Sequence, residues 1–165
     1  MSLYWIMNQD GSSVPHNNVP LQVLLADDDV DDRSFFARIL KELSIPTQLT
    51  MIEDGARLMI HLSENYNRLP DILFIDLNMP RKNGVECLSE IKSNEKLKTL
   101  PIVIISTSVN EEAADLIFNG GAHYYIRKTE ITDLKKNIDH VLTLLVKNKF
   151  SRPTRSKFIL SLDAV

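Results

Sequence analysis

The sequence predicts an α/β protein built on a parallel β-sheet with helices on both faces. Short apolar segments alternate along the chain with stretches in which apolar residues recur at helical spacing. Strict alternation of strand and helix is typical of parallel sheets, because each connection crosses over right-handedly. The length of 165 residues fits one domain, and 44% hydrophobic with 25% charged residues is ordinary for a soluble globular protein. A net charge of -3 argues against a nucleic-acid-binding protein.

Five strand–helix units follow one another. The predicted strands, each a short apolar run closed by a polar or turn residue, are 21–26, 47–52, 71–76, 101–106 and 123–127. Apolar residues at helical spacing predict four of the helices, which lie near 35–43, 58–62, 85–91 and 131–149. Ser108 and Glu111 have the spacing of a capping box for the fourth helix, which Gly120 and Gly121 would close. This pattern predicts a doubly wound, five-stranded parallel sheet of the flavodoxin-like (βα)5 type with strand order 2-1-3-4-5.

The two ends of the chain differ from its middle. Residues 1–20 are turn-rich without periodicity and predict a loose N-terminal arm, whereas 21–147 form the domain. Residues 148–165 form a basic and apolar C-terminal tail, interpreted either as a solvated helix end or as a docking or dimerisation arm. Cys87 is the only cysteine and no apolar run approaches a membrane span, so we expect a cytoplasmic protein without disulfides.

Polar side chains stand at the ends of four predicted strands. Asp27 and Asp28 follow the first strand, Asp76 ends the third, Ser106 ends the fourth and Lys128 follows the fifth. In this topology these four strands are neighbours, and ligands bind at the carboxyl edge of such sheets. We therefore expect three carboxylates, one hydroxyl and one ammonium group to converge there.

This set of groups indicates phosphoryl chemistry. Three close carboxylates repel one another, which raises a pKa or requires a cation. Oxygen ligands without nearby His or Cys favour Mg²⁺ over zinc. A lysine and a serine hydroxyl suit phosphoryl oxygens, so the site could place a phosphoryl group on a carboxylate.

The sequence resembles a response-regulator receiver domain of two-component signalling over about residues 21–147. The segments that carry the resemblance are Leu24–Asp29, Phe74–Pro80 with Gly84, Pro101–Ser106 and Gly121–Lys128. The run Asp76-Leu77-Asn78-Met79-Pro80 further resembles the small stand-alone receivers that act with phytochrome-like kinases.

The resemblance implies a role for each site residue. Asp76 would accept phosphate from a phosphohistidine on a sensor histidine kinase. Asp28, Asp76 and the backbone carbonyl of Asn78 would hold Mg²⁺, with Asp27 acting largely through a bound water. Ser106 would contact the phosphoryl oxygens.

Further positions would act beside these. Lys128 would also contact the phosphoryl group, and Tyr125 matches the aromatic switch residue that turns inward together with a shift of the Ser106 hydroxyl. Asn78, Thr107 and Ser108 would control access to the phosphoryl group.

Two positions depart from the usual receiver pattern. Thr129 replaces the proline that usually follows the lysine, so we expect either a trans Lys128–Thr129 peptide or a strained cis one. Thr107 stands where Ala or Gly is common, and its bulk would narrow access to the phosphoryl group.

These features predict a single-domain response regulator that signals by phosphorylation-dependent contact with a downstream protein or phosphotransfer partner. It would catalyse only its own phosphotransfer and dephosphorylation, and too few residues follow 147 for a DNA-binding output domain. A homodimer through the face of the fourth and fifth helices is a further option. Alternatives are a phosphorylation-independent adaptor and a metal-dependent phosphatase with a nucleophilic Asp, although that class carries a second Asp where this chain has Asn78.

Overall fold

The computed structural model describes residues 4–7, 13–16, 19–108 and 110–160. Its central element is a parallel sheet of six strands in the order β4-β3-β5-β6-β7-β8. Their bounds are β3 (Leu21–Ala26), β4 (Thr47–Ile52), β5 (Ile72–Asp76), β6 (Ile102–Ser106), β7 (Tyr124–Arg127) and β8 (Ile159–Leu160). The first five follow the predicted order, but the predicted count of five strands is wrong because β8 adds a sixth at the β7 edge.

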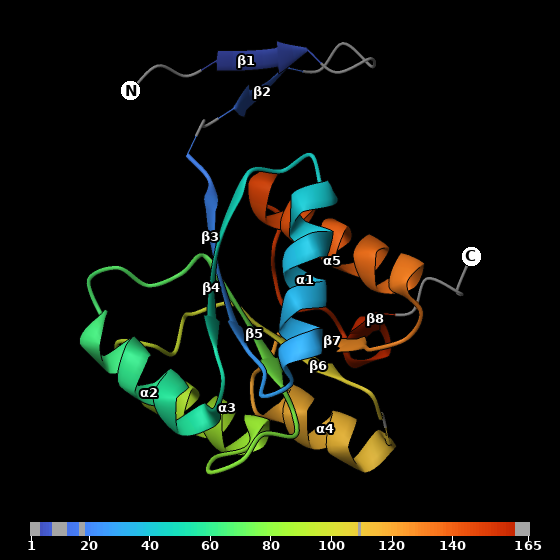
Figure 1. Cartoon of the computed structure of the whole chain (residues 1–165). Helices are drawn as coiled ribbons and strands as arrows, with labels where there is room; N and C mark the ends of the chain where they lie inside the picture. Colours follow the sequence, from blue (N-terminus) through green and yellow to red (C-terminus); the bar gives the residue numbers. More distant parts are fainter. Residues whose placement is uncertain (1–3, 8–12, 17–18, 109, 161–165) are drawn as a thin grey trace.

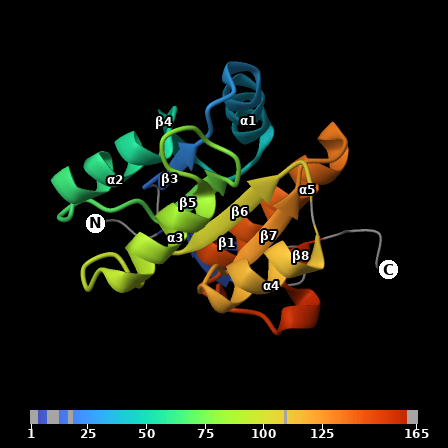
Figure 2. The same ribbon diagram turned by 90° about the horizontal axis from the view of Figure 1, so that it is seen from below.

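Five helices cover the two faces of this sheet (Figures 1 and 2). They are α1 (Val30–Glu42), α2 (Gly55–Glu64), α3 (Gly84–Ser93), α4 (Glu111–Asn119) and α5 (Ile131–Val146). Buried residues of α1 and α5 pack with one face of the strands, and those of α2, α3 and α4 pack with the other. None of the helices in the described part of the chain is long and apolar enough to span a membrane.

The sheet is buried most deeply at its centre, in β5 and β6. All five residues of each strand are buried, as the unbroken apolar runs predict for strands covered on both faces. Phe36 of α1 packs edge-on against Phe74 of β5, with ring centroids 5.0 Å apart. This rigid centre fixes the carboxyl ends of both strands, where Asp76 and Ser106 lie.

The start of α4 differs from the prediction. Asn110, rather than Ser108, is its N-cap, and the Asn110 side chain accepts a hydrogen bond from the backbone N–H of Ala113 at 2.7 Å. Ser108 and Asn110 lie two residues apart and both have side chains suited to an N-cap, and the later of the two begins the helix. Gly120 and Gly121 follow the helix as expected, and Gly121 has a φ of 98°, which favours glycine.

The terminal segments contain more regular structure than their composition indicates. In the N-terminal arm, β1 (Tyr4–Met7) and β2 (Ser13–His16) pair antiparallel as a separate two-stranded sheet. In the C-terminal segment, a 3-10 turn at Arg155–Lys157 leads into β8, and Phe158 is fully buried. The tail is thus anchored to the domain by Phe158 and β8, while most residues of 148–157 are exposed.

Candidate functional site

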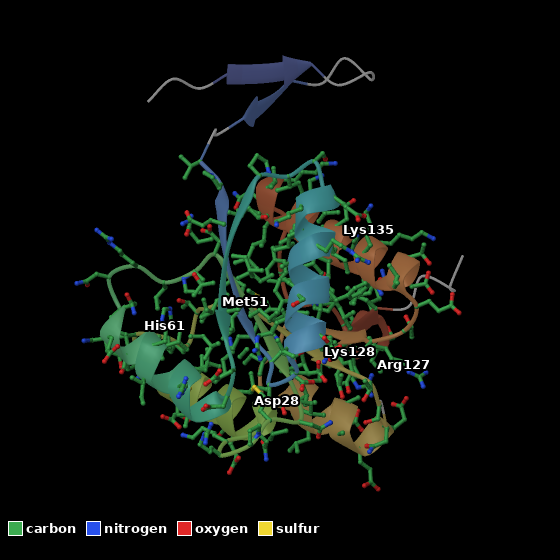
Figure 3. The ribbon with its side chains drawn as sticks, in the orientation of Figure 1. Asp28, Met51, His61, Arg127, Lys128 and Lys135 are labelled. Carbon is green, nitrogen blue, oxygen red and sulfur yellow. The ribbon has the colours of Figure 1, made fainter. Side chains whose placement is uncertain are left out.

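Four strands deliver polar residues to one edge of the sheet. Asp27 follows β3, Asp76 ends β5, Ser106 ends β6 and Lys128 follows β7. The strands lie side by side in register, with Asp76 opposite Ile105 and Ser106 opposite Arg127. In Figure 3 the labelled Asp28 and Lys128 lie toward the same end of the sheet.

Three carboxylates form the centre of the site. One carboxylate oxygen from each of Asp27, Asp28 and Asp76 lies within 4.8 Å of the others. Asp27 is 2% exposed and Asp76 is 7% exposed, whereas Asp28 faces solvent. Asp29 does not join them: it caps α1, and its side chain accepts hydrogen bonds from the backbone N–H groups of Asp31 and Asp32.

The buried carboxylates hold protons more tightly than ordinary aspartates. Burial, with the added repulsion of Asp27 and Asp28, raises the pKa of Asp76 from 3.8 to about 6 although Lys128 opposes the shift. Burial also raises the pKa of Asp27. Above pH 6 the site therefore concentrates negative charge that a divalent cation would neutralise.

Lys128 supplies the positive charge beside these acids. Its Nζ lies 2.8 Å from Asp27 Oδ2, 2.7 Å from Asp32 Oδ2 and 3.4 Å from Asp76 Oδ1. Burial alone would lower the pKa of Lys128, but its hydrogen bonds to Asp27 and Asp32 outweigh burial and raise it. The ammonium group is therefore charged at every physiological pH. The Lys128–Thr129 peptide is trans.

The loop between β5 and α3 carries Asn78, which is exposed. The loop is fixed to the start of α2 by Arg81, whose Nε and Nη2 donate to Asp54 Oδ2 at 3.2 and 3.0 Å. Asp54 is fully buried and also caps α2 by accepting from the backbone N–H of Arg57. The loop ends at Gly84, where the backbone packs so closely that a Cβ would lie only 2.8 Å from the carbonyl oxygen of Asp76.

On the other side of the site, Ser106 is fully buried while Thr107 and Ser108 are exposed. The Tyr125 hydroxyl donates to the carbonyl oxygen of Ser108 at 2.6 Å, and the Tyr125 side chain is fully buried. Tyr125 therefore already points inward, against the loop that follows β6. Phe158 packs behind it, with ring centroids 6.3 Å apart.

Residues of the C-terminal segment contact both Tyr125 and α4. The backbone N–H of Tyr125 donates to the carbonyl oxygen of Phe158 at 3.0 Å. Arg155 pairs with Glu111 and Asp115 of α4 at 2.7 and 2.6 Å. The segment thus covers the edge of β7 and part of α4.

The structure brings together the three acids and the lysine predicted from strand ends, and Ser106 ends the neighbouring strand β6. Sequence reasoning missed Asp32, Asp54 and Phe158 as neighbours of the site. Asp32 had a usable signal, because it lies in the first turn of the helix that begins directly after the acids at the end of β3. Asp54 and Phe158 depend on contacts distant in sequence and gave no local signal.

Comparison with known proteins places these features in a family. The response regulator receiver domain matches residues 23–139. The response regulator Rcp1 of Synechocystis sp. (strain PCC 6803) is 34% identical over 133 residues, which span 76% of this chain and 88% of Rcp1.

Solved structures of response regulators have the same fold as this chain. The phosphorylated cyanobacterial phytochrome response regulator RcpA matches with a TM-score of 0.71 and 27% identity, covering 79% of this chain and 96% of that one. The Mn²⁺-bound form of Rcp1 matches with a TM-score of 0.70 and 30% identity, covering 82% of this chain and 100% of that one. The chain belongs to the response regulator receiver domain family of two-component signalling.

Proposed function

We propose that this protein accepts a phosphoryl group on Asp76 from a sensor histidine kinase and signals by phosphorylation-dependent contact with another protein. The observation that carries the proposal is the convergence of Asp27, Asp28 and Asp76 within 4.8 Å, beside the Lys128 ammonium. Asp76 is the member of the trio that ends a central buried strand, so it has a fixed position and limited solvent contact.

The transfer is a substitution at phosphorus. An oxygen of the ionised Asp76 attacks the phosphorus of a phosphohistidine, an O–P bond forms, and the P–N bond breaks with its electron pair leaving on the imidazole nitrogen. Lys128 and the Ser106 hydroxyl donate to the phosphoryl oxygens. Dephosphorylation is attack by water on the same phosphorus, which returns the Asp76 carboxylate and inorganic phosphate. Such chemistry depends mainly on positioning and charge neutralisation.

The donor set fits Mg²⁺. Asp28 and Asp76 supply carboxylate oxygens, Asn78 would add its backbone carbonyl, and Asp27 would act through water. Mg²⁺ when bound neutralises charge that builds up on the phosphoryl oxygens. The Mn²⁺-bound form of Rcp1 supports this reading, because Mn²⁺ also prefers oxygen ligands.

Phosphorylation would alter the surface near Tyr125. A phosphoryl group on Asp76 draws the Ser106 hydroxyl, and Ser106 begins the loop whose Ser108 carbonyl binds the Tyr125 hydroxyl. The ring would then be held more firmly inward. Thr107, Ser108 and Asn78, all exposed around the site, would regulate access of water and of partners to the phosphoryl group.

The partner would be a sensor histidine kinase of the phytochrome type. Two similar proteins support this assignment: RcpA is a cyanobacterial phytochrome response regulator, and RPA3017, a match of TM-score 0.70 and 25% identity, is a response regulator in red light signaling of R. palustris. A homodimer through the α4 and α5 face would have to accommodate β8, which pairs with the edge of β7, and Arg155, which pairs with α4. The protein would work in the cytoplasm and would turn over no separate substrate.

Intact-mass measurement tests the proposal. With Mg²⁺ and acetyl phosphate the parent should gain one phosphoryl group, whereas Asp76→Ala or excess EDTA should abolish the gain. Asp71→Asn, at the opposite end of the segment that forms β5, is the matched control and should be phosphorylated like the parent. No gain by the parent, or equal gain by Asp76→Ala, would instead favour a phosphorylation-independent adaptor.

A further inference from the structure

Lys128 is shared unequally among three carboxylates. A lysine ammonium has three N–H donors. Two are engaged at short range by Asp27 Oδ2 at 2.8 Å and Asp32 Oδ2 at 2.7 Å. Asp76 Oδ1 lies 3.4 Å away, too far for a strong hydrogen bond. The ammonium is therefore drawn toward α1 and away from the proposed phosphoacceptor.

Asp32 is not a member of the acidic trio. It lies in the first turn of α1, and its side chain is 42% exposed, while that of Lys128 is only 14% exposed. A surface carboxylate thus reaches inward to a largely buried ammonium. Both side chains line a cavity of about 110 Å³ together with Thr129.

A general helix effect does not account for this contact. Acidic residues in the first turn stabilise a helix through its dipole, and Asp31 is equally placed for that role. Asp31 is exposed, and none of the described ion pairs involves its carboxylate. The ion pair with Lys128 is thus a property of Asp32 that its neighbour does not share.

We propose that Asp32 is a positioning residue for phosphotransfer, acting as a counter-ion that holds Lys128 back from Asp76. The inference rests on the proposed function, in which Lys128 contacts the phosphoryl group. The third N–H donor of Lys128 can reach a phosphoryl group on Asp76 only if the ammonium moves toward Asp76, and the ion pair with Asp32 opposes that movement. Asp32 therefore lowers the affinity of the site for phosphoryl oxygens and slows acceptance of the group.

Loss of the Asp32 charge should strengthen binding of a phosphoryl mimic. In Asp32→Asn, Lys128 keeps one short ion pair with Asp27 and can approach Asp76. Because the Asp32 side chain is half-exposed, we expect a gain of about three- to fivefold, in the range of a partly exposed ion pair. The probe is beryllium trifluoride with saturating Mg²⁺, whose bound form is counted by 19F NMR. The phosphorylation rate with acetyl phosphate should rise in parallel.

Asp31→Asn is the matched control. It removes the same charge from the same helical turn without touching Lys128, so beryllium trifluoride should bind it as it binds the parent. Equal affinities of Asp32→Asn and Asp31→Asn, or weaker binding by Asp32→Asn, would overturn the inference.

A double-mutant cycle separates positioning from a general charge effect. In a Lys128→Gln background, at probe concentrations raised to saturate the weaker variants, Asp32→Asn should no longer change the affinity. A gain that persists without Lys128 would show that Asp32 does not act through it. If the parent itself binds no beryllium trifluoride and takes up no phosphate, the proposed function fails and the inference fails with it. A competent parent with an unresponsive Asp32→Asn overturns the inference alone.

Discussion

Replacement of Asp76 by asparagine should make the metal-free protein more stable while abolishing phosphorylation. The folded state raises the pKa of Asp76 from 3.8 to about 6, chiefly through burial. An ionised Asp76 therefore opposes folding. One pKa unit corresponds to about 1.4 kcal/mol, so the ionised carboxylate costs about 3 kcal/mol at pH 7.5. Asparagine keeps the shape without this charge.

The pH dependence follows from the direction of the shift. Because the folded state binds the proton more tightly, the penalty grows as pH rises above 3.8 and is complete above about 6. The advantage of Asp76→Asn should therefore be about 3 kcal/mol at pH 7.5, about half of that at pH 5 and less than about 1 kcal/mol at pH 4. At neutral pH, an advantage of about 3 kcal/mol corresponds to a Tm that is higher by about 6–12 °C for a chain of this size.

Urea unfolding in EDTA at these pH values measures the effect. Asp28→Asn removes a charge from the same cluster at an exposed position and should gain less than about 1 kcal/mol. Millimolar Mg²⁺ should narrow the gap, because the ion binds the folded parent. An Asp76→Asn protein that is no more stable than the parent at pH 7.5, or whose advantage does not shrink in acid, would refute the reasoning.

Three further substitutions test other parts of the structure. Phe158→Ala should lower the free energy of unfolding by about 3–4 kcal/mol, or release β8 and expose the Tyr125 amide to hydrogen exchange. A variant with parent-like stability and parent-like exchange would contradict the burial of Phe158 against β7. Gly55→Ala places a Cβ against the carbonyl oxygen of Lys82, in the loop between β5 and α3 that also carries Asn78. It should lower the free energy of unfolding by about 1–3 kcal/mol and weaken Mg²⁺ binding in calorimetry, and parent-like values would exclude the contact. Thr107→Ala should lose its phosphate faster than the parent in a phosphate-release assay, and equal lifetimes reject a shielding role.

The central fold and the core of the site follow from local patterns in the sequence. The apolar runs that form β5 and β6 are long enough to specify strands buried on both faces, and the residue at each strand end is fixed by where the run stops. Since parallel neighbours share one carboxyl edge, the convergence of Asp27, Asp76 and Lys128 required only the strand order.

The features that sequence reasoning missed depend on long-range contacts. Phe158-Ile159-Leu160 is too short to distinguish a strand from a loose apolar tail, and only pairing with β7 makes it a strand. Likewise, Arg155 looks like one of several tail cations until its side chain meets Glu111 and Asp115. Asp32 was visible as an acid, but its partner is 96 residues away.

Locating the phosphorylated residue tests the account most directly. Borohydride reduction converts an aspartyl phosphate into a stable product whose position is read by peptide mapping. After treatment with Mg²⁺ and acetyl phosphate, the modified residue should be Asp76, with Asp27 and Asp28 unmodified. Modification at another acid, or none in a protein shown to bind Mg²⁺, would contradict the claim that this carboxyl edge receives the phosphoryl group.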